Sequence, residues 1–345
     1  MQSSRNLSPV RRAPRHIALW LTALALLGLG LGQSPARGES IAVPGSTGTP
    51  GLTLRSQSAG EVVLHYEMGS YGVESVEVGG QSMQKIVLSG VFLPNNAGAP
   101  DLPGLGRFIA IPEGATATVE VENATILRRG DFRVAPAPEI PKDTDPIRAA
   151  TPDPAIYGRD AFYPAQPALL SEPGEMRGVD VVNLGLTPFQ YNPVSGELLV
   201  YAEADIRIRF HGGTGTFGED RLRSRSWDSI LAQHLVNFAS LPAVDFDQRR
   251  AGRDGFEYII ITPDHPDFIA WGDTLKTWRK LQGITTETFT TTEVGGTTSA
   301  AIEAFLNNAY NTWEIAPDAF LRLGDFPSTG FRDSGITAPT WNSYC

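Results

Sequence analysis

The sequence contains 345 residues, of which 41% are hydrophobic, with a formal net charge of −10 at pH 7 and a single cysteine, Cys345. The acidic balance argues against nucleic acid and anionic membrane surfaces as partners, because both carry negative charge. A single cysteine excludes an intramolecular disulfide framework, so the fold must rest on hydrophobic cores, and the length is sufficient for two domains.

Residues 1–38 have the pattern of a secretory signal peptide. Four arginines precede an apolar run over residues 17–31, and Ala36-Arg37-Gly38 puts small residues at the two positions that determine cleavage. The apolar run, about fifteen residues, is shorter than the roughly twenty that a helix needs to cross a bilayer, which argues against a transmembrane anchor. We predict secretion, cleavage between Gly38 and Glu39, and no membrane span afterwards. The mature net charge would be −15, because the segment holds five arginines and no acidic residue.

Residues 39–59 are rich in Gly, Pro, Ser and Thr and have no period, which predicts a flexible leader. Over residues 60–212 the pattern changes to short β-rich segments separated by turn signals such as Gly79-Gly80. These segments lie at residues 62–66, 73–78, 85–88, 107–111, 116–121, 179–184 and 197–210. No convincing helix lies between them, so we predict an antiparallel, all-β sandwich-like domain over residues 60–212.

Several turn motifs of this region occur in a recognisable order. They are Gly98-Ala-Pro-Asp-Leu-Pro103, Ile111-Pro-Glu-Gly114, Tyr163-Pro164 and Phe189-Gln-Tyr-Asn-Pro193, followed by Gly196-Glu-Leu198. In order and position they resemble the propeptide domain of gingipains, which are secreted bacterial cysteine peptidases. The resemblance implies a β-sandwich that folds with a peptidase domain and keeps it inactive until it is cleaved.

Two segments are predicted to connect other elements. Residues 135–167 contain many prolines and are interpreted as an exposed loop or crossover, with a disordered linker as the alternative. Residues 213–255 contain a helical apolar pattern that would cover the sandwich or bridge the domains. The pattern is carried by Trp227, Ile230, Leu231, Leu235 and Phe238.

Residues 256–325 form the most regular part of the sequence, with strands predicted at 256–262, 284–292 and 319–323 and a helix after each of the first two. Asp264 would cap the first helix and Gly283 would end it. Its buried apolar stripe would consist of Phe268, Trp271, Leu275, Trp278 and Leu281. The second helix would be capped by Thr297, Thr298 or Ser299. Strands that alternate with helices predict a parallel sheet, with any site at the carboxyl ends of the strands.

This region also resembles gingipains. The resemblance rests on Tyr-Ile-Ile-Ile-Thr-Pro-Asp at 258–264, Trp278 with Leu-Gln-Gly-Ile at 281–284, the segment that follows to Tyr310, and Phe-Leu-Arg-Leu-Gly-Asp-Phe-Pro at 320–327. These residues are similar, in register, to the opening of the gingipain peptidase domain. The resemblance implies a caspase-like α/β fold for residues 256–345 and a catalytic Cys-His dyad located beyond Cys345.

The basic segment of residues 247–253 stands immediately before this domain. Its composition alone favours a solvated linker, although an extended basic segment is also a suitable protease substrate. Gingipain precursors are processed at arginine in this region. The resemblance therefore implies maturation cleavage at Arg249, Arg250 or Arg253.

No residue of this chain is assigned a catalytic role. Cys345 is the last residue, follows no apolar strand, and has an α-carboxylate that would oppose the thiolate a nucleophile requires. His265 and Asp325 follow predicted strands, where we expect a turn or helix-capping role for the histidine and a turn-forming or site-adjacent role for the carboxylate. The spacing of His, Cys, Asp and Glu predicts no metal site, no cofactor is identified, and bound calcium is left undecided.

Three strands and two helices leave an exposed sheet edge and a small core, so we expect the chain to stop inside a domain. The leading hypothesis is the N-terminal portion of the precursor of a secreted gingipain-like cysteine endopeptidase. It would act on protein or peptide substrates, and its pro-domain would contact its peptidase domain. On this hypothesis the present chain alone is inactive. The alternative is a non-catalytic secreted binding or inhibitory protein built on the sandwich.

Overall fold

The computed structural model describes residues 38–46, 51–89, 95–140, 150–246 and 254–324. Residues 1–37 of the predicted signal peptide lie outside the described residues. The predicted maturation sites Arg249, Arg250 and Arg253 lie outside them too, as do Asp325 and Cys345. From Glu39 onward the described residues belong to one compact unit. Within the described ranges, no helix is long and apolar enough to span a membrane.

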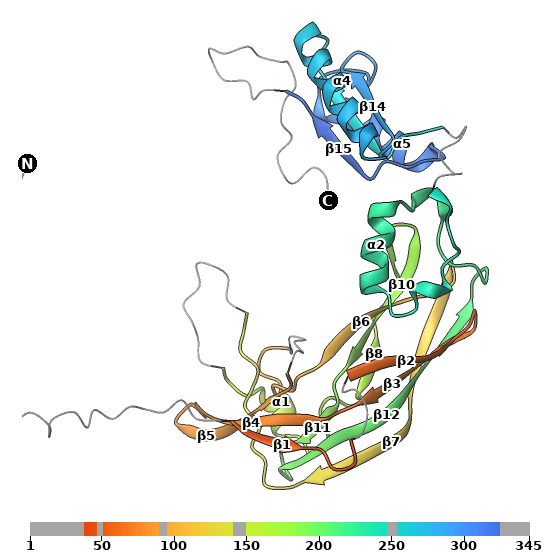
Figure 1. Ribbon diagram of the computed structural model, residues 1–345. Helices are drawn as coiled ribbons and strands as arrows, with labels where there is room; N and C mark the ends of the chain where they lie inside the picture. Colours follow the sequence, from red (N-terminus) through yellow and green to blue (C-terminus); the bar gives the residue numbers. More distant parts are fainter. Residues whose placement is uncertain (1–37, 47–50, 90–94, 141–149, 247–253, 325–345) are drawn as a thin grey trace, which may run out of the picture. The chain divides into compact units, whose positions relative to one another are not determined.

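The N-terminal region is an antiparallel β-sandwich, as predicted (Figure 1). Its five-stranded sheet is built on the long strand β12 (Glu197–Gly212). β7 (Ala115–Arg129) runs along one edge of β12, while β11 (Phe189–Asn192) and β3 (Glu61–Glu67) share the other edge, and β2 (Gly51–Gln57) follows β3. The other sheet has the order β6 (Leu105–Ala110), β10 (Val179–Leu186), β8 (Ala168–Leu170), with β9 (Gly174–Met176) beside β10. A third sheet joins β1 (Glu39–Ala42), β4 (Ser70–Val78) and β5 (Gln81–Val87).

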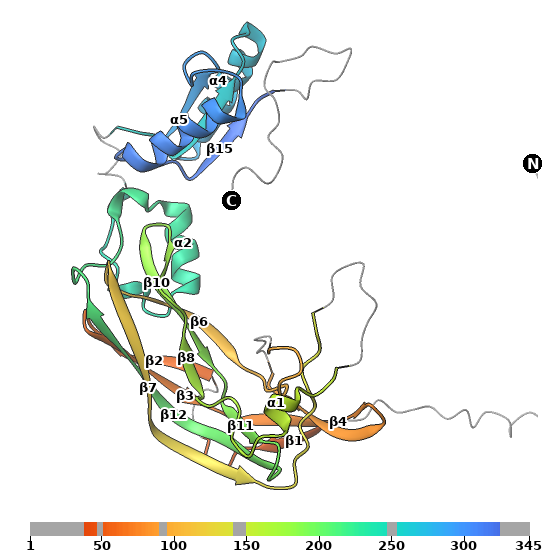
Figure 2. The same ribbon diagram turned by 180° about the vertical axis from the view of Figure 1, so that it is seen from behind.

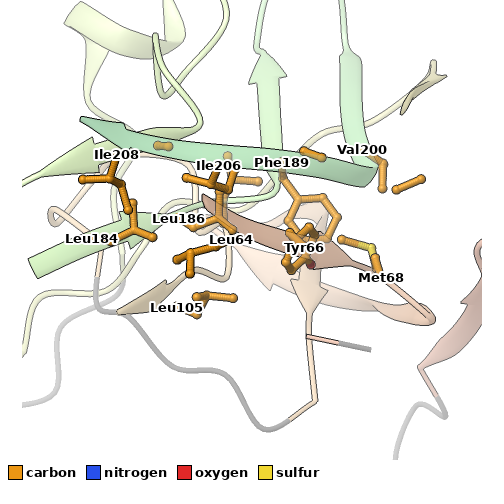
Figure 3. Packing of buried hydrophobic residues seen from close by; sticks show 14 of the residues in the cluster. Leu64, Tyr66, Met68, Leu105, Leu184, Leu186, Phe189, Val200, Ile206 and Ile208 are labelled. Carbon is orange, nitrogen blue, oxygen red and sulfur yellow. The ribbon is translucent and has the colours of Figure 1, made fainter. Parts of the chain in front are cut away.

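The core of the sandwich lies between the two larger sheets and follows from alternation along their strands. On β12, Ile206 and Ile208 are fully buried, whereas Arg207, which stands between them, is half-buried on the opposite face. Figure 3 shows these isoleucines pointing toward Leu184 and Leu186 of β10. Successive side chains of a strand face opposite sides of the sheet. The apolar side chains on the inner face of each sheet therefore pack together to form the core.

The predicted flexible leader over residues 39–59 is wrong for most of the residues that the structure describes. Glu39–Ala42 form β1, which pairs with β4, and Gly51–Gln57 form β2, which pairs with β3. Every side chain of both strands is exposed or half-buried. The sequence of these strands therefore lacks the alternation of apolar residues that identifies a half-buried strand. Backbone hydrogen bonds to a neighbouring strand hold these edge segments instead.

The proline-rich segment 135–167 is partly packed against the sandwich. Ala135 and Ala137 are buried. The one-turn helix α1 (Pro154–Tyr157) is capped by Asp153, and the Tyr157 hydroxyl donates a hydrogen bond of 2.8 Å to the carbonyl of Val134. The interpretation as an exposed loop is therefore wrong for these residues, and residues 141–149 lie outside the described part of the chain.

A helix covers the four-stranded sheet, which is one of the two arrangements predicted for residues 213–255. α2 (Arg225–His234) begins after Ser224, whose hydroxyl accepts a hydrogen bond from the backbone N–H of Trp227. Leu231 and Leu235 pack in a cluster with residues of β6 and β10. The helix is shorter than its apolar pattern because the chain becomes extended at Leu235. Single 3-10 turns, η1 (Asp220–Leu222) and η2 (Phe238–Ser240), lie on either side of it.

The C-terminal segment is the predicted parallel sheet with two helices. β13 (Tyr258–Thr262) lies between β14 (Thr286–Thr290) and β15 (Ala319–Arg322), and all three run parallel. α4 (Pro266–Leu281) and α5 (Ser299–Thr312) cover opposite faces of this sheet, as Figures 1 and 2 show from two sides. Ile259 and Ile261 pack with Ile302 of α5. Thr298, one of three caps considered, accepts the hydrogen bond from Ala301 N and begins α5.

Two predictions for α4 are wrong. The residue that caps it is His265, not Asp264. Its apolar stripe is not buried among the described residues, since Trp271, Trp278 and Leu281 are 66%, 50% and 82% exposed. The helix instead meets the sheet at Gly272, its one buried residue. The predicted stop at Gly283 is confirmed, because Gly283 adopts a φ of +79° directly after the helix.

Candidate functional site

The carboxyl ends of β13 and β14 are tied together by Asp264. Its carboxylate accepts a hydrogen bond of 3.1 Å from the backbone N–H of Thr292 and further ones from the hydroxyls of Thr292 and Thr291. The hydrogen bond from the Thr292 hydroxyl is the main cause that lowers the pKa of Asp264. A carboxylate held in this way stays ionised and joins two loops. It fixes the loops at the carboxyl ends of the strands, and it is poorly suited to act as a general base.

His265 stands at the same edge and has the capping role expected for it. Its Nδ1 accepts a hydrogen bond of 3.3 Å from the backbone N–H of Asp267, and its ring lies edge-on to Phe268 with the ring centroids 6.1 Å apart. Because Nδ1 serves as the acceptor of the cap, this arrangement orients the first turn of α4. The described residues at this edge include no cysteine that could pair with this imidazole.

A second cluster, around Asp205 on the sandwich, was missed by the sequence reasoning. The Asp205 carboxylate accepts hydrogen bonds from Arg55 at 2.9 Å and from Asn123 at 3.0 Å, and it contacts His65 Nδ1 at 2.9 Å. Glu203 approaches the other ring nitrogen of His65 at 3.5 Å. His65 of β3 thus lies between two carboxylates. Among the described residues, no group of His, Cys, Asp and Glu could hold a metal ion.

The third arrangement joins the sandwich to the α/β segment. Arg177, in the turn between β9 and β10, makes an ion pair of 2.6 Å with Asp318 and donates a hydrogen bond of 2.9 Å to the carbonyl of Pro317. Its guanidinium lies 5.5 Å from the ring centroid of Trp227 and 5.3 Å from that of Tyr310. The two charged side chains are 7% and 15% exposed. A buried pair of this kind is costly to break, because either charge would be left without its partner.

Other hydrogen bonds support the same contact. Asp318 accepts a hydrogen bond of 2.8 Å from the Ser226 hydroxyl at the start of α2. Arg221 donates one of 2.5 Å to the carbonyl of Tyr310, and the backbone N–H of Ala316 donates to the carbonyl of Arg221 at 3.3 Å. Burial raises the pKa of Asp318, while the Ser226 hydroxyl and the charge of Arg177 oppose the rise. No motif in the sequence pointed to this contact, since its residues come from segments that are distant from one another in the chain.

Comparison with known families covers both folded regions. The family model Propeptide_C25 matches residues 45–239, and the model for Peptidase family C25 matches residues 252–332. The chain belongs to the C25 peptidase family. The first match takes up more than half of the chain and coincides with the sandwich and α2. The second coincides with the parallel sheet and its two helices, so the family predicted from the sequence is confirmed.

Individual relatives agree with the family assignment. Lys-gingipain from Porphyromonas gingivalis is 25% identical over 316 residues, which cover 85% of this chain and 17% of Lys-gingipain. Gingipain R2 from the same species is 26% identical over 228 residues, which cover 62% of this chain and 29% of that protein. The chain thus spans less than a third of the length of either relative.

A solved structure with a similar fold is among the matches. It is described as the complex of Porphyromonas gingivalis RgpB pro- and mature domains, and it matches with a TM-score of 0.50 and 22% sequence identity. The match covers 56% of this chain and 100% of the matched chain. The fold class predicted from the sequence, a β-sandwich-like pro-domain followed by the start of an α/β domain, is confirmed by this likeness and by the observed sheets.

Proposed function

We propose that this chain is the N-terminal portion of the precursor of a secreted gingipain-like cysteine endopeptidase, which acts on protein or peptide substrates. The observation that carries the proposal is the order of the two family matches, with a C25 propeptide directly followed by the start of a C25 peptidase domain. In this proposal, the sandwich together with β1, β2 and α2 is the pro-domain, residues 247–253 are the processing linker, and residues 256–345 begin the peptidase domain.

The chemistry of the proposed peptidase requires residues beyond Cys345. A cysteine nucleophile needs a thiolate, an imidazole close to it and donors that stabilise the oxyanion. At the described carboxyl edge of the sheet, the Asp264 carboxylate accepts hydrogen bonds from threonine residues and His265 caps α4. We therefore expect the Cys-His dyad on later strands of the same sheet, and we expect this chain alone to hydrolyse no peptides.

Reading the coding sequence past the codon for Cys345 tests the proposal. An open frame that continues to a histidine and a cysteine at strand ends is the expected result. The polypeptide of the whole frame should then cleave protein substrates, and replacement of that cysteine by alanine should abolish the cleavage. A stop codon at this position would contradict the proposal and favour a non-catalytic secreted binding or inhibitory protein.

Export is a second part of the proposal. Gly38 and Glu39 are both exposed, and Glu39 begins β1, so a cut between them leaves that strand intact. Mass spectrometry of the secreted protein should find a new N-terminus at or near Glu39. A membrane-bound product that keeps Met1 would contradict signal cleavage while leaving the peptidase assignment untouched.

A further inference from the structure

We propose that the Arg177–Asp318 contact is the docking site through which the propeptide region holds the opening segment of the peptidase domain without help from the covalent linker. The inference deepens the proposed function and rests on it, since it assigns a task to the propeptide after maturation. The contact consists of Arg177, Arg221, Ser226 and Trp227 on one side and Tyr310, Ala316, Pro317 and Asp318 on the other.

The position of the contact in the chain is the first argument. Every residue on its first side precedes residues 247–253, and every residue on its second side follows them. Cleavage at Arg249, Arg250 or Arg253 would therefore cut the backbone between the two sides and leave all of these interactions intact. The contact would then be what joins the two products.

The second argument is that Arg177 has the features of an interface hot spot. It is nearly fully buried, it forms a short ion pair with Asp318, and it touches an aromatic ring from each side of the contact, Trp227 from α2 and Tyr310 from α5. Arginine and aromatic residues that are excluded from water carry a large share of binding energy at interfaces. The planar guanidinium also serves several acceptors at once, which a lysine ammonium does with less geometric definition.

The third argument comes from the backbone of the turn that presents Arg177. Arg177 has a φ of +54° and Gly178 a φ of +73°, a conformation that L side chains rarely adopt. A Cβ at Gly178 would lie 2.6 Å from a side-chain carbon of Leu222, so the turn is packed tightly against η1. The N–H of Gly178 donates to Glu175, and its carbonyl accepts from Glu219 N. These contacts hold the turn in a backbone conformation that is unfavourable for Arg177 and that places its guanidinium beside Asp318.

A cut-linker binding experiment tests the docking site. Residues 247–253 of the full chain are replaced by the recognition sequence of a site-specific protease, the purified chain is cut, and the association of the two pieces is measured by size-exclusion chromatography and by dilution. The wild-type pieces should stay together. Arg177→Ala should raise the dissociation constant by at least about 30-fold, the effect expected for a hot-spot residue.

The matched control is Arg128→Ala, which removes an arginine from an exposed ion pair with Glu197 within the sandwich. It should change the dissociation constant by less than about 3-fold, as is usual for exposed pairs. Separation of the wild-type pieces on cutting, or equal affinities for Arg177→Ala and Arg128→Ala, would overturn the proposal.

A second variant covers the possibility that Arg177→Ala disturbs the sandwich itself, which a thermal melt of the uncut chain would reveal. Asp318→Asn changes the other side of the contact, leaves the sandwich sequence intact, and should also raise the dissociation constant at least about 10-fold. An unchanged value for Asp318→Asn would overturn the docking site. Peptidase activity has no part in this assay, so its result is independent of the test of the proposed function.

Discussion

Asp205 illustrates how single polar residues are accommodated inside the sandwich. Burial by itself would raise the pKa of this carboxyl, but hydrogen bonds from Asn123 and His65 and the charge of Arg55 together lower it. Asn123 reaches the carboxylate from a φ of +50°, beside the register shifts of the β7–β12 pairing. Three side chains distant in sequence thus converge on one carboxylate, which makes the site sensitive to the charge of Asp205.

We predict that Asp205→Asn lowers the free energy of unfolding by about 1–3 kcal/mol at pH 7, because the charged hydrogen bonds are lost while their donors stay partly buried. The folded pKa lies below the unfolded one, so the stabilisation is present above about pH 4 and is lost as the pH falls through the folded value. Urea unfolding should therefore give a smaller difference in the free energy of unfolding between wild type and Asp205→Asn at about pH 3 than at pH 7.

The matched control for this prediction is Glu77→Gln, which removes a carboxylate from an exposed position on β4. It should leave the free energy of unfolding within about 0.5 kcal/mol of wild type, as surface substitutions usually do. If the free energy of unfolding differs between wild type and Asp205→Asn by the same amount at both pH values, the charge of Asp205 does not stabilise the fold.

At the scale of elements, α4 shows that helical periodicity can identify a helix and still mistake the face that it buries. The sequence places large apolar residues on one stripe, but the helix approaches the sheet at Gly272. A Cβ there would lie 2.8 Å from Thr288 Cγ2 and 3.0 Å from Thr262 Cγ2. The absence of a side chain permits this close approach. The stripe of Trp271, Trp278 and Leu281 is left largely exposed in the described part of the chain.

We predict that Gly272→Val destabilises the α/β segment by about 2 kcal/mol, since overpacking against Thr262 and Thr288 of the sheet costs about 1–3 kcal/mol. The comparison is Ala270→Val, at an exposed position of the same helix, which should cost only the propensity difference of about 0.6 kcal/mol. Thermal and urea unfolding of both variants measures the difference. Equal losses for the two variants would show that Gly272 is not a close-packing position.

At the scale of the whole molecule, two folded regions stand on either side of the basic segment 247–253. Proteases cut extended segments that can enter a cleft without unfolding a domain. Most arginines of the described regions are less suitable, because they stand in strands or helices. Because the propeptide match precedes the peptidase match, we propose that cleavage in this segment matures the precursor.

We predict that replacement of Arg249, Arg250 and Arg253 together by glutamine leaves an unprocessed precursor, as measured by the size and the N-terminal sequence of the secreted products. The control replaces Arg128 and Arg129, at the end of β7, by glutamine and should be processed as wild type. Normal processing of the triple variant would show that maturation does not require cleavage at these arginines.

The sequence by itself determined the elements whose signals are local. Apolar alternation, turn residues and helical spacing lie within a few neighbours of one another, so the sandwich, the parallel sheet and the stop of α4 at Gly283 could be predicted directly. The resemblance to gingipains rested on the same local runs. The cap at Thr298 was among three adjacent choices, because capping depends on one backbone geometry that neighbouring residues can share.

Only the tertiary structure decided the features that depend on residues distant in the chain. β1 and β2 are edge strands held by backbone pairing, which leaves no side-chain period. The partners of Asp205 lie 82 to 150 residues away, and Arg177 stands 141 residues before Asp318. The physical reason is that the burial of a charged side chain and the pairing of an edge strand depend on the neighbours that folding brings together. Neither can be predicted from the residue alone.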